Sequence, residues 1–104
     1  MNLDHLKSLL GDDDTLVNQF LKIFKEETPN QLNALKSSAE QASWSEASIL
    51  AHSIKSQLKY LSLNELAQLA YTIETNCEKQ KDLDDIQNQI DRLYKGVHAS
   101  ILNL

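Results

Sequence analysis

The stretch SWSEASILAHSIKSQLKYLSLNELAQLAYTIETNC, residues 43–77, carries two apolar stripes with the spacing of α-helices. Apolar side chains recur every three or four residues and therefore share one face of each helix. The first stripe consists of Ala47, Leu50, Ala51, Ile54, Leu58 and Leu61, and the second of Leu66, Leu69, Ala70, Ile73 and Cys77. Ser43–Glu46 and Ser62–Glu65 both fit the Ser-x-x-Glu capping box that begins a helix. The stretch predicts two long helices joined by a short turn.

A third long helix is predicted on the N-terminal side of this pair. Asp12–Asp14 and Thr15 provide negative charge and capping oxygens at its start. Its apolar positions are Leu16, Phe20, Ile23, Phe24, Leu32, Leu35 and Ala39. Pro29 lies inside this helix and, because it lacks a backbone donor, should kink the helix or split it in two. Residues 3–10 predict a short amphipathic helix before it, closed by Gly11.

The last long helix is predicted from Asp82 onward, after a polar loop at Glu78–Lys81. Its apolar positions are Leu83, Ile86, Ile90, Leu93, Val97 and Ile101, which is nearly a heptad pattern. The connection at Glu40–Ser43 is equally short, and short connections make consecutive helices antiparallel neighbours. The sequence therefore predicts an all-α fold, an up-down-up-down four-helix bundle with a short extra N-terminal helix. We expect one domain over residues 1–104.

Composition and charge argue against several classes of protein. A single cysteine rules out an intramolecular disulfide framework. The first ten residues, MNLDHLKSLL, lack the pattern of a signal peptide, and no apolar run is long enough to span a membrane, so we expect a cytoplasmic location. The net charge of -5 disfavours nucleic acid and anionic lipid as partners. We expect a monomer that binds neither nucleic acid nor membrane.

One histidine lies on the polar side of its predicted helix. Because helical residues advance by about 100° each, the apolar positions Leu50 and Ile54 point away from His52. The neighbours that share the face of this histidine are Ser48, Lys55, Ser56 and Lys59. An exposed histidine is usually an ordinary surface residue. Here, however, two lysines would favour a phosphoryl group electrostatically, small side chains leave the ring accessible, and histidine can act as a nucleophile.

The other candidate groups predict no further chemistry. His5 and His98 are too far apart in the sequence from each other and from His52 to predict a metal site. Cys77 belongs to an apolar stripe and has no charged neighbour that would activate its thiol. The chain also lacks a glycine-rich phosphate loop, so nothing predicts ATP binding or kinase activity. We expect neither a metal nor a cofactor.

The stretch AHSIKSQLKYLSLNELAQLAYTIE, residues 51–74, resembles the signature of histidine-phosphotransfer domains. In that family the histidine is followed three residues later by lysine and then by glycine, and an apolar helix ends near a glutamate. The segment LGDDDTLVNQFLKIFKEETPNQLNAL, residues 10–35, resembles the second helix of the family, and Trp44 is a further similarity. The resemblance extends over roughly Leu3 to Glu78.

The resemblance implies a role for each matching residue. His52 would be the phosphoacceptor, Lys55 its basic neighbour, and Glu74 the residue that orients the imidazole by a hydrogen bond. Ser56 and Ser62 stand where the family usually has glycine, and we expect Ser62 to cap the following helix. The implied function is that of a stoichiometric phosphocarrier in a multistep phosphorelay, with no enzymatic activity of its own. The implied partners are receiver domains, which supply the aspartate and the magnesium, with a hybrid sensor kinase as a further candidate.

A competing hypothesis is a helical bundle that only binds partner proteins, as an adaptor or scaffold. In that case His52 would be incidental. Ile49 lies about 60° from His52 on the same helix and could contribute to an apolar docking patch under either hypothesis. Phosphorylation of His52 that is labile in acid and stable in base separates the two.

Overall fold

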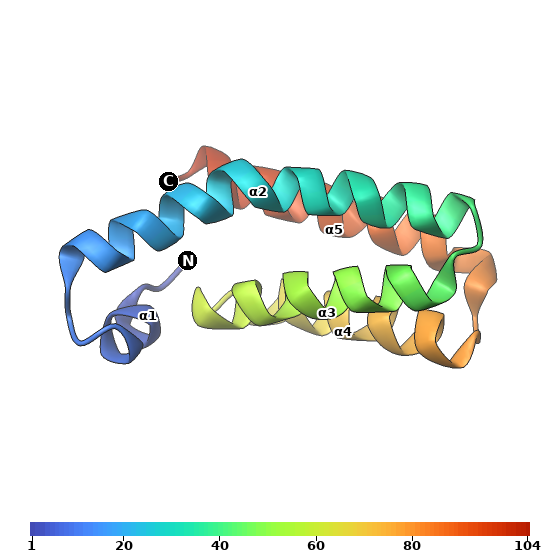
Figure 1. Ribbon diagram of the computed structural model, residues 1–104, viewed down its shortest axis with the longest axis horizontal. Coiled ribbons are helices and arrows are strands. Elements are labelled where there is room, and N and C mark those ends of the chain that lie inside the picture. The colour runs from blue at the N-terminus through green and yellow to red at the C-terminus, as the bar shows by residue number, and fades with distance from the viewer.

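The computed structural model describes all 104 residues and is built entirely from helices and short turns (Figure 1). The elements are α1 (Asp4–Leu9), α2 (Asp14–Glu40), α3 (Trp44–Tyr60), α4 (Asn64–Lys79), a 3-10 turn η1 (Leu83–Asp85) and α5 (Ile86–Leu102). The four long helices alternate in direction, and each packs against two of the others, in the pairs α2–α3, α3–α4, α4–α5 and α2–α5. The short α1 lies against α2. The predicted up-down-up-down bundle with an extra N-terminal helix is confirmed.

The bundle is held together by one apolar core to which every α-helix contributes. Its buried residues are Leu6, Val17, Phe24, Leu32, Leu35, Ala39, Ala47, Ala51, Ile54, Leu58, Leu61, Ala67, Ala70, Ile73, Cys77, Ile86, Ile90, Leu93 and Val97. In α3 and α4 the predicted stripe residues all belong to this core or pack against it. Removal of these apolar surfaces from water is the main favourable term in folding, and it fixes which face of α3 remains exposed.

The long helix α2 is continuous through Pro29, so the predicted split does not occur. The helix changes direction partway along its length in Figure 1, as expected of a helix that contains an interior proline. Its start is as predicted, because the Asp13 side chain accepts hydrogen bonds from the backbone N–H groups of Thr15 and Leu16. Packing against α3 and α5 supports the helix across the lost hydrogen bond.

Two of the predicted core positions in α2 are wrong. Leu16 and Ile23 are exposed, whereas Val17 and Thr28, which were not predicted, are buried on the same side as the predicted Phe24. The other five predicted positions, Phe20, Phe24, Leu32, Leu35 and Ala39, belong to the core or pack against it, so the predicted stripe is right apart from these two residues. The buried Thr28 hydroxyl donates a hydrogen bond to Gln57 Oε1 on α3, at 2.7 Å. An apolar pattern could not identify a core position that is occupied by threonine.

The two capping boxes do not form. The N-cap residues of α3 and α4 are Ser43 and Leu63, and neither makes a side-chain capping hydrogen bond. Ser62 was expected to cap α4, but it does not. It follows the C-cap of α3 with a φ of 58°, the left-handed conformation that glycine adopts most easily. Ala42 has the same conformation after α2, with a φ of 56°. The Ser-x-x-Glu pattern therefore marks these turns without describing their hydrogen bonds.

The connection before α5 lies later in the chain than predicted. Helix α4 continues through Lys79, so most of the expected loop at Glu78–Lys81 is helix or its cap. Gln80 and Asp82 take left-handed conformations, and η1 precedes α5, which begins at Ile86 and not at Asp82. The chain thus reverses within three residues between two helical turns.

We expect Ala42→Gly to stabilise the protein by about 0.5–1 kcal/mol, because an L-residue in the left-handed region carries a steric cost that glycine avoids. Ala34→Gly is the matched control, since Ala34 is an exposed residue within α2. The same chemical change there should destabilise by about 1 kcal/mol. Urea denaturation followed by circular dichroism measures both variants. Two changes of the same sign would contradict this account of the turn.

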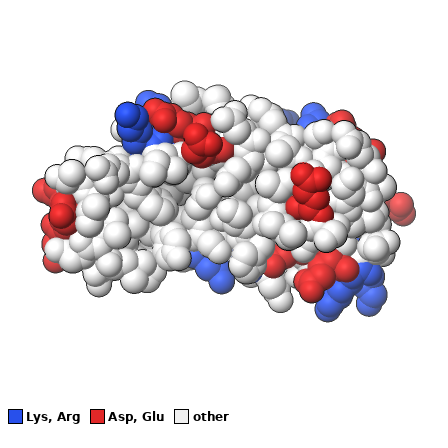
Figure 2. Space-filling model, viewed as in Figure 1, with Lys and Arg blue, Asp and Glu red and all other residues white.

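Charged side chains lie in small groups on the face shown in Figure 2, where acidic and basic residues adjoin in places and no continuous basic patch is seen. The one ion pair between lysine and aspartate joins Lys36 of α2 to Asp91 of α5 across 3.8 Å, and both side chains are about half exposed. Such a pair contributes little to stability. None of the helices combines the length and apolar character needed to cross a membrane. The expected cytoplasmic location stays a prediction.

Candidate functional site

His52 lies in the middle of α3 with its side chain 60% exposed. Its neighbours in the sequence on the opposite face, Ala51 and Ile54, are fully buried. The apolar contacts of α3 with the rest of the bundle thus fix the rotation of the helix and direct the imidazole outward. The predicted exposure of His52 is confirmed.

The imidazole is held from the neighbouring helix by a carboxylate. Glu74 of α4 places Oε2 at 2.8 Å from His52 Nδ1, and its other oxygen, Oε1, accepts a hydrogen bond from Lys55 Nζ, also at 2.8 Å. Helices α3 and α4 are antiparallel neighbours with extensive contact, which brings together residues that are 22 positions apart. We call His52, Lys55 and Glu74 the histidine–lysine–glutamate cluster.

The position of Lys55 differs from the one expected for it. The sequence placed two ammonium groups on the exposed face around His52, but the Lys55 side chain is only 11% exposed. Its ammonium group pairs with the carboxylate of Glu74 on α4. Lys59 remains exposed, as predicted. The positive charge nearest to the imidazole is therefore already paired within the protein.

Hydrogen-bond chemistry determines the tautomer of the ring. An ionised carboxylate can only accept, so the short contact with Glu74 requires a proton on Nδ1 of His52. Lys55 Nζ lies 3.3 Å from the same nitrogen, but ammonium and N–H are both donors, so both donate to Glu74 and not to each other. In the neutral ring the lone pair is then on Nε2. This nitrogen makes no hydrogen bond within the protein.

Glu74 stays ionised despite its position between two helices. Burial removes water from the carboxylate and by itself would raise its pKa, but hydrogen bonds from Lys55 and His52, together with their positive charge, outweigh this effect. The pKa of Glu74 is thus lowered from its ordinary value of 4.5. All buried polar side-chain atoms of the protein have a hydrogen-bond partner. The cluster is therefore a satisfied polar network and not a strained one.

Glu74→Gln should lower the free energy of unfolding at neutral pH and lose this effect as the pH falls. Because the pKa of Glu74 is lower in the folded than in the unfolded state, its carboxylate stabilises the fold above pH 4.5. This contribution disappears as the pH falls through the folded-state pKa. Urea denaturation of wild type and variant between pH 7 and pH 3 should show two curves that converge, and Glu78→Gln, on the exposed side of α4, is the control. A constant difference would mean that Glu74 acts through packing alone.

The other predicted site residues lie on α3 on both sides of the histidine. Ser48 and Ser56 are half-buried, and the Ser56 hydroxyl donates to the backbone oxygen of His52 at 3.1 Å. Ile49 is 68% exposed, among the largest exposed fractions of any apolar side chain in the protein. It lies between two shallow hollows near Trp44. The face around His52 thus combines an accessible ring, small side chains and one protruding apolar residue.

Tyr71 is a member of the site that the sequence did not indicate. Its ring lies beneath the Lys55 ammonium group, with Nζ 5.1 Å from the ring centroid. Tyr71 precedes Glu74 by three residues and therefore lies on the same side of α4. The three-residue spacing between Tyr71 and Glu74 was the only signal in the sequence that could have indicated Tyr71. It becomes informative only once Glu74 is known to pair with a cation.

The remaining candidate groups do not form a second site. His5 and His98 are exposed, and His98 stacks on Tyr94, with 6.3 Å between ring centroids. Burial raises the pKa of the Cys77 thiol to about 11, so this thiol is a core side chain with little thiolate character at neutral pH. No group of three or more His, Cys, Asp or Glu side chains is placed to hold a metal ion.

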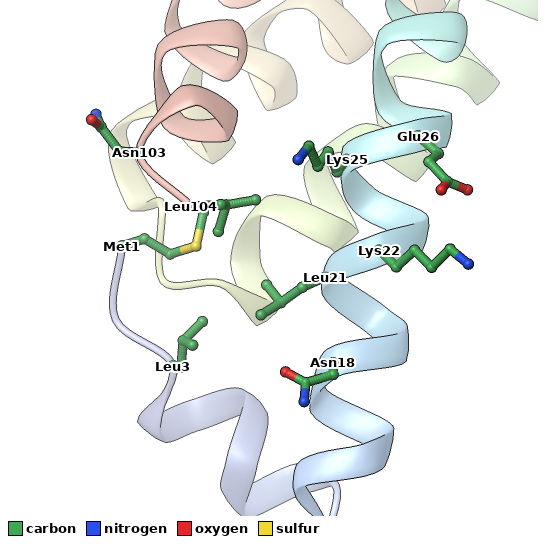
Figure 3. Close-up of a pocket in the computed structure, with 9 residues that line it drawn as sticks. All are labelled: Met1, Leu3, Asn18, Leu21, Lys22, Lys25, Glu26, Asn103 and Leu104. Atoms are coloured by element: carbon green, nitrogen blue, oxygen red, sulfur yellow. The ribbon is translucent and has the colours of Figure 1, made fainter.

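A hollow between the two ends of the chain is the other notable surface feature (Figure 3). Met1 and Leu104 lie close together there, and Leu3 and Leu21 point toward the same space. Lys22 and Glu26 of α2 point away from it. The hollow is lined by four apolar residues and by the polar Asn18, Lys22, Lys25, Glu26 and Asn103.

The structure is thus a four-helix bundle in which α3 presents a histidine outward. The family model described as Hpt domain matches residues 19–101, and the chain therefore belongs to the Hpt domain family. Domains of this family carry out histidine phosphotransfer in phosphorelays and are phosphocarrier modules rather than catalysts. Comparisons with curated proteins and with solved structures gave no match.

Proposed function

We propose that this chain carries a phosphoryl group on Nε2 of His52 between the aspartates of two receiver domains. The observation that supports this most directly is the pairing of Nδ1 with Glu74, which leaves Nε2 as the nitrogen with a free lone pair on an exposed face. The family match supplies the class of reaction and of partner. A hybrid sensor kinase is a candidate source of the first receiver domain.

The proposed transfer exchanges one phosphorus bond for another. The Nε2 lone pair attacks the phosphorus of the receiver's aspartyl phosphate, an N–P bond forms, and the P–O bond to aspartate breaks. The aspartate leaves as a carboxylate. The ring gains positive charge during the attack, and the Glu74 carboxylate, 2.8 Å from Nδ1, stabilises that charge. Transfer to the second receiver reverses these steps.

The remaining residues have supporting roles in this proposal. Lys55 fixes Glu74 by its ion pair, and the exposed Lys59 provides the positive charge that attracts the acidic surface of a receiver. Ile49 and the small Ser56 and Ser48 form the surface on which the receiver docks. The protein acts as a monomer and stoichiometrically, and the receiver contributes its own magnesium and catalytic groups.

The experiment is to mix the purified chain with a receiver domain that has been labelled with radioactive phosphate. The label should move to the chain, resist base, be lost in acid, and move on when a second, unlabelled receiver is added. An adaptor that only binds would form a complex with the receiver without taking up label. Binding without transfer, with several receivers tested, would therefore contradict the proposal and favour the adaptor.

A further inference from the structure

We propose that Tyr71 is a positioning residue that holds the Lys55 ammonium group on Glu74 and thereby fixes the orientation of the His52 ring. The inference rests on the function proposed above, because its purpose is to keep one nitrogen of His52 free for phosphoryl transfer. The contact from which Tyr71 is inferred to act is a feature of the structure and does not depend on that function. The Tyr71 ring lies 5.1 Å from Lys55 Nζ, on a residue that neither the family pattern nor the apolar stripes identify.

Lys55 needs such a contact because its ammonium group has only one anionic partner. Glu74 Oε1 accepts one hydrogen bond from Nζ, and the other nearby group, His52 Nδ1, is itself a donor. A flexible lysine loses considerable rotamer freedom when it is held in one position. The negative face of an aromatic ring attracts a cation and supplies the missing contact without competing for the carboxylate.

The geometry links Tyr71 to the histidine through two further residues. Tyr71 and Glu74 lie one turn apart on α4, while His52 and Lys55 lie one turn apart on α3. The four side chains thus alternate between the helices, from ring to ammonium, to carboxylate, to imidazole. Loss of the ring should free Lys55 to move into water, since Tyr71 itself is 49% exposed. Glu74 would then be less firmly placed and more easily protonated.

The test compares Tyr71→Leu with Tyr71→Phe, because phenylalanine keeps the aromatic face and leucine does not. Tyr94→Leu is the matched control, since Tyr94 is a similarly exposed tyrosine on α5, outside the cluster. NMR titration of the Glu74 side-chain carboxyl carbon is the first readout, and the rate of phosphoryl acceptance by His52 is the second. A purely structural role would not change a carboxyl titration.

In Tyr71→Leu the pKa of Glu74 should rise, and acceptance should slow about two- to fivefold, the size expected of an exposed cation–π contact. Tyr71→Phe should restore both values, and Tyr94→Leu should change neither. An unchanged Glu74 titration in Tyr71→Leu would overturn the inference. If wild-type His52 accepts no phosphoryl group at all, the proposed function fails, and the titration still decides whether Tyr71 positions the cluster.

Discussion

Replacement of His52 by glutamine should abolish phosphoryl acceptance while leaving the bundle folded. Glutamine has an amide that can still donate to Glu74, but it has no nucleophilic nitrogen to form an N–P bond. Because the side chain is 60% exposed, unfolding free energy should change by no more than about 0.5 kcal/mol. Uptake of label from a phosphorylated receiver, together with the urea midpoint, measures both effects.

His98→Gln is the control for this loss, because His98 is an exposed histidine on α5. It should accept label at the wild-type rate. If His52→Gln takes up label at the wild-type rate and His98→Gln takes up none, the phosphoacceptor is His98. That result would contradict the assignment to His52.

Ser56→Leu should reduce transfer from a receiver by about a hundredfold, the loss that even slight misplacement of reacting groups can produce. Helical side chains lean toward the N-terminus, so a residue one turn after His52 covers the surface near the imidazole. A leucine there would obstruct the approach to Nε2, whereas serine is small and uses its hydroxyl to bond the His52 carbonyl. Quenched-flow transfer assays measure the rate, and circular dichroism checks the helix content.

Two comparisons show whether the Ser56 effect is one of access. Ser56→Ala keeps the small size and should transfer nearly as well as wild type. A small phosphodonor such as phosphoramidate should label Ser56→Leu far better, relative to wild type, than a receiver domain does. If Ser56→Leu takes up phosphate from a receiver at the normal rate, the receiver does not approach over this face of α3.

The fold could be predicted because periodic apolar side chains decide it. The apolar stripes within residues 16–39, 47–77 and 83–101, and the short connections between them, were sufficient for the number and direction of the long helices. Apart from the capped start of α2, the details at helix ends could not be predicted. Leucine at the N-cap of α4 and left-handed backbone at Ala42 and Ser62 depend on how the packed helices meet, and local sequence preference is too weak to override that packing.

The site was predicted only in part, for a physical reason. Helical spacing alone showed that His52 faces solvent, since this follows from the position of its neighbours in one helix. It could not show that Lys55 turns toward α4, because the choice depends on a carboxylate 19 residues away. Glu74 was reached through resemblance to a family, and Tyr71 was missed, since contacts between helices leave no periodic signal in the chain.

The most direct test of the central claim is to identify which atom carries phosphate after the chain is labelled. The chain is prepared with 15N histidine, phosphorylated, and examined by proton–nitrogen and phosphorus NMR. We expect one phosphorylated histidine, His52, with phosphorus bonded to Nε2 and the proton retained on Nδ1 beside Glu74. Phosphate on Nδ1, on His5 or His98, or on no histidine at all would contradict it.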